Sequence, residues 1–238
     1  ENCSGEVPGA GIVSGIGIVA GREVILHGDD ASVKGGAWYP ESVKKIVRTL
    51  DIAIENHLPV VHLCDSAGGF LPAQADFFAD RYYAGRMFRN QSILSKMGVP
   101  QVSIVLGHCT AGGAYIPALS DYSVIVRGTG AIFLGGPPLV KAATGEDVTV
   151  DELGGADMHT RVSGTADYPA STEDEAIAIA RDIVAQLHRP EKTRIDWQAP
   201  EPPYYDPSEL HGVIPRDIKV QFDMREVIAR MVDGSRFH

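Results

Sequence analysis

The sequence contains little cysteine and no long apolar run. Its three cysteines, Cys3, Cys64 and Cys109, have no short paired spacing, so they fit neither a disulfide framework nor a zinc site. No apolar stretch is long enough to span a bilayer, and the first residues lack the basic start and apolar segment of a secretory signal. We therefore expect a metal-free protein of a reducing compartment such as the cytoplasm.

Positive charge is also scarce. The chain has 21 Lys and Arg against 31 Asp and Glu, a formal net charge of −10, and no long basic block. This balance argues against nucleic acid or an anionic membrane surface as a partner. An anionic ligand would have to be bound locally by a few groups. The 238 residues, 44% of them hydrophobic, are enough to build one large core, or one core and the start of another.

Apolar strands and amphipathic helices alternate along most of the chain. Strands are expected at 11–19, 23–26, 60–64, 102–106, 123–126 and 131–134, and helices at 40–56, 80–96, 111–119, 137–143 and 172–188. The two central strands are apolar on both faces, which is typical of a parallel sheet that helices cover on both sides. The pattern predicts an α/β fold. Beyond it, a proline-rich stretch at 189–215 predicts an extended arm, and 222–231 predicts one more helix.

Two of the expected strands end in turns of small residues. The strand at 60–64 leads into a first turn, Asp65–Phe70, and the strand at 102–106 leads into a second turn, Gly107–Tyr115. The first N–H groups of a helix have no partner within it, and the helix dipole places partial positive charge there, so such a turn can hold an oxyanion. Alternatively, paired glycines only allow a helix to pack closely on a strand.

The two turns are expected to meet. Because parallel strands place their carboxyl ends along one edge of a sheet, Ala67–Gly68 and Gly112–Gly113 could each direct an amide at a single oxygen. Two preorganised donors of this kind would each stabilise a developing negative charge by on the order of 3 kcal/mol. This arrangement suits the enolate of a thioester.

An acid, base or nucleophile is harder to find near these turns. An enoyl thioester hydratase or isomerase needs a carboxylate about one turn into the second helix, where the chain has Ala114–Ile116. A hydrolase would use Ser66 or Cys109 with a histidine base. However, His62 lies in mid-strand as an expected core residue, and His108 adjoins Cys109, so their side chains should diverge. We therefore expect the base to arrive with a second substrate.

Several stretches together carry a family resemblance. They are Asp30–Pro40, Leu71–Asp76, Gly85–Arg86, Asn90–Gln91, Cys109–Pro117, Phe133–Glu146 and Glu152–Ala156. With them the chain resembles the N-terminal half of the carboxyltransferase (beta) subunit of biotin-dependent acyl-CoA carboxylases, which has the crotonase-like fold, a β-β-α superhelix. Lys34–Ala37, Leu71–Pro72 and Gly113–Tyr115 look most like the 3-methylcrotonyl-CoA or geranyl-CoA branch of that family. Ala67, Phe70 and Ala73 depart from the family pattern and leave the acyl group open.

The resemblance implies a reaction and its partners. A carboxyl group would move from carboxybiotin, carried by a biotin carboxylase and biotin carboxyl carrier (alpha) subunit, to an acyl-CoA. The acyl group would be a branched enoyl group such as 3-methylcrotonyl, with propionyl or acetyl as the alternative. Biotin would also supply the missing base. Members of the family assemble as rings, so the resemblance implies a homo-oligomer together with the alpha subunit.

The resemblance and the turns also imply site residues. The residues that would hold the thioester oxygen are Ala67, Gly68, Gly112 and Gly113. The residues that would line the coenzyme A path are Lys34, Gly35, Gly36, Gly135, Gly136 and Lys141. The residues that would shape the acyl pocket are Phe70, Ala111, Ala114 and Tyr115. Turn glycines, solvated lysines and core packing are the alternative interpretations of the last two sets.

The implied domain organisation is an acyl-CoA-binding domain at 1–195, a proline-rich linker at 196–220 and the start of a second carboxyltransferase domain at 221–238. The oxyanion site for biotin would belong to that second half. Two interpretations of another class stay open at this point. One is a crotonase-like hydrolase or hydratase, and the other is a non-catalytic binding and assembly module.

Overall fold

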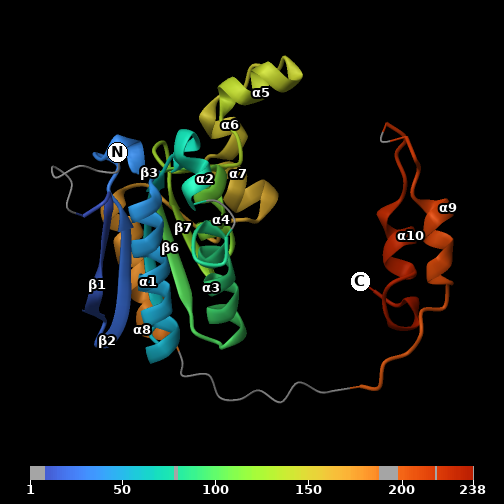
Figure 1. The fold of residues 1–238 in the computed structure, drawn as a ribbon, viewed down its shortest axis with the longest axis horizontal. Coiled ribbons are helices and arrows are strands. Elements are labelled where there is room, and N and C mark those ends of the chain that lie inside the picture. Colours follow the sequence, from blue (N-terminus) through green and yellow to red (C-terminus); the bar gives the residue numbers. More distant parts are fainter. Residues whose placement is uncertain (1–8, 78–79, 188–197, 218, 238) are drawn as a thin grey trace. The chain divides into compact units, whose positions relative to one another are not determined.

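The computed structural model describes residues 9–77, 80–187, 198–217 and 219–237. The chain forms two compact units, Glu1–Arg189 and Pro190–His238. The first unit contains the sheet and the helices that cover it, and the second is small and helical (Figure 1). Among the described residues, the search for a helix both long and apolar enough to cross a bilayer finds none.

A seven-stranded sheet forms the centre of the first unit within the described residues. Its strands are β1 (Ile12–Val19), β2 (Arg22–Asp29), β4 (Val60–Ser66), β6 (Gln101–Thr110), β7 (Tyr122–Val126), β8 (Ala131–Phe133) and β9 (Tyr168–Ala170). β1 and β2 form an antiparallel hairpin, and β2, β4, β6, β7 and β9 follow one another in parallel. Since β6 extends beyond β7, its last residues His108–Thr110 pair with β8.

Helices cover both faces of this sheet. α1 (Pro40–Asn56) and α3 (Ala84–Lys96) lie side by side on one face, and α8 (Glu173–Gln186) lies behind the other (Figure 1). Because alternate strand residues point to opposite faces, Val60 and Cys64 join the core under α1, whereas Val61 and Val102 join the core under α8. The two-sided apolar strands thus have the covering helices that the sequence predicts.

Short elements follow the carboxyl ends of the parallel strands. They are η1 (Lys34–Gly36), β3 (Ala37–Trp38), β5 (Gly68–Gly69), η2 (Leu71–Ala73), α2 (Gln74–Phe77), η3 (Ala111–Ala114), α4 (Tyr115–Ala118), α5 (Pro137–Thr144), α6 (Val150–Gly154), α7 (Ala156–Met158) and the π-helical turn η4 (His159–Ser163). β3 and β5 pair in parallel as a separate small sheet. α5 and α6 stand out from the upper edge of the sheet in Figure 1.

Most predicted elements form, with boundaries that shift for local reasons. The strand predicted at 102–106 continues to Thr110, because β8 offers it a second parallel partner. The helix predicted from residue 80 begins at Ala84, since Asp80 Oδ1 accepts a hydrogen bond from the Tyr82 N–H (2.8 Å) and holds a turn there. The helix predicted at 111–119 is a 3-10 turn followed by a single α-helical turn.

α8 matches its predicted position. Thr172 caps the helix, and its side-chain oxygen accepts a hydrogen bond from the Glu175 N–H (3.2 Å). The last residue predicted for this helix, 188, lies outside the described residues.

The second unit corrects one expectation. Its elements are η5 (Pro207–Glu209), α9 (Leu210–Val213), α10 (Met224–Ala229) and η6 (Asp233–Ser235). The extended arm predicted at 189–215 is wrong for 207–213, which is helical, because Asp206 accepts a hydrogen bond from the Ser208 N–H (2.8 Å) and caps the turn. The rest of that stretch up to residue 197 lies outside the described residues, and the predicted domain boundaries stay a prediction.

One arginine organises this second unit. Arg230 forms ion pairs with Glu209 and Glu226, both at 2.8 Å, and its guanidinium lies 5.2 Å from the centre of the Tyr205 ring. The helix predicted at 222–231 spans Met224–Ala229. Arg230 therefore joins α10 to η5 within a unit that has few buried apolar side chains in its described part.

Candidate active site

The first and second turns lie against each other at the carboxyl edge of the sheet. Ser66, at the end of β4, pairs with Cys109 of β6. A Cβ atom built on Gly68 would lie 2.7 Å from the carbonyl oxygen of Thr110, and Gly68 has a φ of 82°. A Cβ atom built on Gly113 would lie 3.1 Å from the carbonyl oxygen of Ser66. The predicted meeting of the two turns therefore occurs through glycine contacts that a side chain would obstruct.

The amides of the first turn already have acceptors within the protein. The Ala67 N–H donates to the carbonyl oxygen of Gly35 (3.2 Å), and the Gly68 N–H donates to Ser66 Oγ (3.1 Å). To bind a substrate oxygen, either amide would have to form a bifurcated hydrogen bond or give up its present acceptor. The first turn is thus mainly a support.

The second turn presents its amides differently. η3 is a 3-10 helix that begins at Ala111, and its i to i+3 pattern leaves the N–H groups of Ala111 and Gly112 without an intrahelical acceptor. The nitrogen of Gly112 lies 3.6 Å from the position that a Cβ atom on Gly68 would take. Gly112 is half-buried and Ala111 is exposed. Gly112 is therefore the best-placed donor for an oxyanion.

The loop that contains Lys34, Gly35 and Gly36 packs on the end of β4. All three residues have a left-handed backbone, with φ values of 54°, 65° and 69°. The carbonyl oxygen of Gly36 accepts a hydrogen bond from Ser66 Oγ (2.8 Å). Lys34 is exposed and makes none of the ion pairs found among the described residues. Its charge is therefore available beside the first turn.

The other predicted coenzyme A residues lie on the far side of the second turn. β4 and β8 flank opposite sides of β6, so Gly135 and Gly136, which follow β8, are separated from Lys34 by the second turn. Lys141 of α5 pairs with Asp147 (2.6 Å), and both side chains are exposed. The two predicted basic residues therefore lie on opposite sides of the second turn, and Lys141 already has a carboxylate partner.

An apolar hollow of about 450 Å³ lies next to the second turn. The residues that line it are Ala114, Tyr115, Ala118, Ile132, Phe133, Leu134, Gly135, Leu153 and His159. Ala114 and Tyr115 are the two predicted pocket residues that line this hollow. Phe70 stacks on Tyr39 instead, with the ring centres 4.6 Å apart, and Ala111 is exposed on the turn. The volume of the hollow lies within the range of about 300–1,000 Å³ that is usual for small-molecule sites.

His159 contributes an imidazole to the wall of this hollow, and the sequence analysis missed it. Its Nε2 lies 2.7 Å from the carbonyl oxygen of Ile132, and its Nδ1 lies 2.8 Å from Ser163 Oγ. It begins the π-helical turn η4, a conformation that occurs often at functional sites. A single histidine without a surrounding motif gives no signal in the sequence, so only the pairing of β6 with β8 reveals its position.

The possible nucleophiles are held in structural roles. Ser66 Oγ donates to the Gly36 carbonyl oxygen and accepts from the Gly68 N–H. Cys109 is fully buried, and a hydrogen bond with Cys109 together with burial raises the pKa of the Cys64 thiol well above its usual range. His108 packs its ring against Phe133, with the ring centres 5.7 Å apart. These contacts disfavour a serine or cysteine hydrolase.

His62 is a core residue, as predicted. It is buried on β4, and its Nδ1 lies 3.1 Å from Nδ1 of His27 on β2. Burial lowers the pKa of His62 well below its usual range, and the neighbouring His27 lowers it further. A histidine held neutral in the core cannot serve as a base for the turns.

Asp65 is a carboxylate at the end of β4. Partial burial raises the pKa of Asp65, and the nearby Asp29 carboxylate raises it further. Its carboxyl group takes the space that a side chain on Gly107 would need. Asp65 is thereby packed into the seam between β4 and β6.

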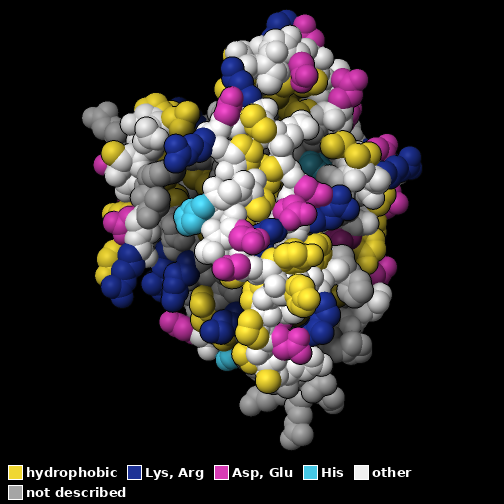
Figure 2. Space-filling model, turned by 90° about the vertical axis from the view of Figure 1, so that its right-hand side faces the viewer, with side chains coloured by type: hydrophobic (Ala, Val, Ile, Leu, Met, Phe, Trp, Pro, Cys, Tyr) yellow, Lys and Arg dark blue, Asp and Glu magenta, His cyan; other side chains and the backbone are white. Residues whose placement is uncertain are grey.

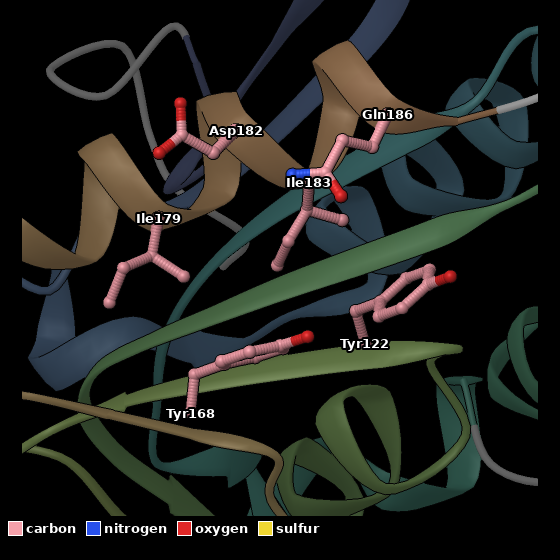
Figure 3. Close-up of a pocket in the computed structure, with 6 residues that line it drawn as sticks. All are labelled: Tyr122, Tyr168, Ile179, Asp182, Ile183 and Gln186. Carbon is pink, nitrogen blue, oxygen red and sulfur yellow. The ribbon is translucent and has the colours of Figure 1, made fainter.

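A second hollow, of about 270 Å³, lies elsewhere in the first unit (Figure 3). Its lining residues are Tyr122, Tyr168, Ile179, Asp182, Ile183 and Gln186. The tyrosines come from the first residues of β7 and β9, and the other four side chains come from α8. This hollow is therefore at the amino ends of the strands, at the opposite edge from the glycine turns.

Charged side chains of both signs are mixed at the surface. On the face drawn in Figure 2, Lys and Arg side chains lie among Asp and Glu side chains and exposed hydrophobic ones.

Comparisons with known proteins agree with this geometry. A family model described as "Carboxyl transferase domain" matches residues 1–238. The chain is 54% identical over 232 residues to the mitochondrial methylcrotonoyl-CoA carboxylase beta chain of Dictyostelium discoideum, covering 98% of this chain and 40% of that protein. It is 51% identical to the biotin-dependent 3-methylcrotonyl-coenzyme A carboxylase beta1 subunit of Mycobacterium tuberculosis, covering 98% of this chain and 44% of that protein.

Solved structures agree as well. The beta subunit of geranyl-CoA carboxylase from P. aeruginosa aligns with a TM-score of 0.69 and 43% identity over 95% of this chain and 42% of that one. The transcarboxylase 12S structure with methylmalonyl-coenzyme A aligns with a TM-score of 0.73 and 33% identity over 98% of this chain and 45% of that one. The chain thus spans less than half the length of these relatives, and the crotonase-like α/β fold predicted from the sequence is confirmed. By a match along its whole length, the chain belongs to the carboxyl transferase domain family.

Proposed function

We propose that this chain forms the acyl-CoA half of a carboxyltransferase site. The reaction would convert an acyl-CoA and carboxybiotin into a carboxylated acyl-CoA and biotin. The observation that carries the proposal is the Gly112 amide, which has no intrahelical acceptor and lies above the bare α-carbon of Gly68. Preorganised amides of this kind stabilise an oxyanion by on the order of 3 kcal/mol each.

The thioester oxygen of the acyl-CoA is the group that these amides would hold. Loss of a proton from the acyl carbon moves negative charge onto that oxygen, and the Gly112 N–H would stabilise it. Gly113 keeps the second turn close to Ser66, and Ala67 and Gly68 keep the first turn in place. In this proposal the four predicted residues therefore divide into one primary donor and three supports.

The base that removes the acyl proton would come from the partner rather than from this chain. η3 and α4 carry no carboxylate and no histidine, and the nearby Ser66 and Cys109 side chains are engaged or buried. When bound on its partner, carboxybiotin supplies both carbon dioxide and the base for the acyl proton. The chain's part is to hold the thioester, to place the acyl carbon and to exclude water.

The acyl group would lie in the hollow beside Tyr115. The similarity to two proteins named for 3-methylcrotonyl-CoA supports a branched enoyl group, and propionyl-CoA or acetyl-CoA is the alternative within the family. A longer branched chain is a second candidate, because the hollow is about 450 Å³ and a neighbour at 43% identity is a geranyl-CoA carboxylase. Lys34 and the Gly135–Lys141 segment would contact the coenzyme A.

The same relatives support partners and a compartment. We infer a biotin-carrying alpha subunit as the partner, since the relatives are beta chains of biotin-dependent carboxylases. A homo-oligomer is supported by the hexamer named for the transcarboxylase core. Beta chains named as mitochondrial support a matrix location in a eukaryote, and the cytoplasm is the corresponding location in a bacterium.

The test uses the natural polypeptide that carries this chain, whatever its length, with its biotinylated partner, ATP and radiolabelled bicarbonate. Incorporation of label into 3-methylcrotonyl-CoA, geranyl-CoA, propionyl-CoA and acetyl-CoA is compared. We expect the highest kcat/KM with a branched enoyl-CoA and none without biotin. Hydration or thioester cleavage without biotin would favour the hydratase or hydrolase. No turnover together with no binding of any acyl-CoA would favour an assembly module.

A further inference from the structure

Trp38 connects the two turns through its main chain and its ring. It is buried, with 2% of its surface exposed, and it forms β3 with Ala37. β3 pairs with β5, and the carbonyl oxygen of Trp38 accepts a hydrogen bond from the Phe70 N–H (2.9 Å). The main chain of Trp38 thus holds the first turn on both sides of Gly69.

The indole ring of Trp38 reaches the second turn. A Cβ atom built on Gly112 would lie 3.5 Å from Trp38 Cζ3 and 3.8 Å from Cζ of Phe88. The edge of the ring therefore faces the α-carbon of Gly112 across a space that a single methyl group would fill. A tilt of the indole would close or widen that space and so change the room that is available to the second turn at Gly112.

A carboxylate fixes the tilt of that ring. The Trp38 Nε1–H donates to Oδ1 of Asp29, at the carboxyl end of β2, with a distance of 2.9 Å. An indole has a single polar hydrogen, and here it is directed at a carboxyl oxygen. Burial raises the pKa of Asp29, whereas the nearby His27 and the hydrogen bond from Trp38 lower it. The other carboxylate oxygen of Asp29, Oδ2, is buried and has no hydrogen-bond partner among the described residues.

The cost of Asp29 argues against a purely structural role. A buried carboxylate oxygen without a partner destabilises a fold, and a core built for stability alone would tolerate an apolar pair at this position better. What the hydrogen bond to Asp29 provides is orientation, because it sets the rotation of the Trp38 indole ring. That rotation determines where the six-membered ring meets Gly112.

We propose that Asp29 and Trp38 are positioning residues for carboxyl transfer, with Asp29 fixing the Trp38 indole and Trp38 holding the first and second turns at their working separation. This inference rests on the proposed function, in which Gly112 binds the thioester oxygen. It adds two residues, one from β2 and one from β3, that touch neither the acyl carbon nor the carboxyl group. They would act by aligning the Gly112 amide. Their loss should therefore lower the stabilisation of the transition state more than the binding of the substrate.

The test compares three variants with a control in the natural polypeptide and its biotinylated partner. Asp29→Asn retains an oxygen that can accept from the indole, Asp29→Leu removes it, and Trp38→Phe removes the indole N–H. Val184→Ala is the control, because Val184 is buried under α8 on the opposite face of the sheet. We expect Asp29→Leu and Trp38→Phe to lower kcat about tenfold with KM for acyl-CoA within about twofold. Asp29→Asn should recover most of the activity.

Hydrogen exchange supplies a readout that does not depend on turnover. Peptides that cover 66–71 and 107–116 should exchange faster in Asp29→Leu and Trp38→Phe than in Asp29→Asn or Val184→Ala. Unchanged exchange in both turns overturns the inference, and so does an equal loss of kcat in Asp29→Leu and Val184→Ala. If the unmodified protein carboxylates no acyl-CoA, the proposed function fails, while the exchange pattern still decides whether Asp29 and Trp38 hold the turns.

Discussion

The first and second turns look alike in sequence and differ in how their backbone amides are used. Each follows a buried parallel strand and contains a small residue and paired glycines. In the first turn, the amides of Ala67 and Gly68 donate to Gly35 and Ser66. In the second turn, the 3-10 geometry leaves the Gly112 N–H without an intrahelical acceptor. One sequence pattern thus gives a first turn whose amides are engaged within the protein and a second turn whose Gly112 amide has no intrahelical acceptor. The variants below test the support and donor roles that we propose for them.

Gly112→Val should have the largest effect. The Cβ atom would lie 3.5 Å from the Trp38 ring, so the two methyl groups beyond it would push the turn and displace its amide. Loss of an oxyanion donor lowers kcat by about 10²–10³-fold, and we expect a loss of that size in the carboxylation assay. Gly15→Val in β1 is the control, because Gly15 has open space around it. Full activity of Gly112→Val would contradict the assignment of the Gly112 amide as an oxyanion donor.

Gly68→Ala should act through the contact between the turns. The new Cβ atom would lie 2.7 Å from the Thr110 carbonyl oxygen at a φ of 82°, and such a backbone strain costs about 1–3 kcal/mol. Gly21→Ala is a matched control, because Gly21 has a φ of 77° and nothing near its Cβ position. Both variants should lower the free energy of unfolding in chemical denaturation, and only Gly68→Ala should lower kcat, by about tenfold. Equal kcat values would show that the contact has no role in catalysis.

Ser66→Ala distinguishes a support from a nucleophile. The variant removes the hydrogen bond to Gly36 and the acceptor of the Gly68 N–H, which should cost about 1–3 kcal/mol of stability. Because the Gly68 amide is then released, we expect kcat to change by only a fewfold. Ser92→Ala, which removes an exposed hydroxyl on α3, is the control in thermal unfolding. A near-complete loss of activity with unchanged stability would instead favour the hydrolase interpretation.

The sequence was sufficient to predict the order of the elements and the shared edge of the sheet. These follow from local periodicity and from the fact that parallel strands place their ends together. The engaged amide of Ala67 could not be predicted, because its acceptor, Gly35, lies in a loop some thirty residues earlier. Likewise, Ile132 and His159 line the hollow because β6 extends to Thr110 and pairs with β8, a pairing between segments some twenty residues apart that local periodicity does not reveal.

Acid should lower the free energy of unfolding through the buried histidines of β2 and β4, next to the first turn. Burial lowers the pKa of His27 and of His62, so the unfolded chain binds more protons than the native protein below pH about 6.5. Stability should therefore fall as the pH falls from about 6.5, by at most about 1.4 kcal/mol per pH unit for each histidine. His62→Gln should reduce that slope in denaturation series between pH 7 and pH 5. His57→Gln, at the exposed end of α1, is the control for the substitution itself, and an identical slope in His62→Gln and the unmodified protein would contradict the assignment.

The two lysines that flank the turns should differ in their effect on coenzyme A. Lys34 is exposed beside the first turn and makes none of the ion pairs found in the described residues, whereas Lys141 already pairs with Asp147 (2.6 Å). An exposed charge pair contributes little, so Lys34→Ala should raise KM for acyl-CoA about two- to fivefold with kcat unchanged, and added salt should shrink the difference. Lys141→Ala should have a smaller effect, because any phosphate must compete with Asp147. The double variant Lys141→Ala, Asp147→Ala keeps the local net charge and isolates that competition. A larger effect at Lys141 than at Lys34 would place the phosphates on the α5 side of the second turn.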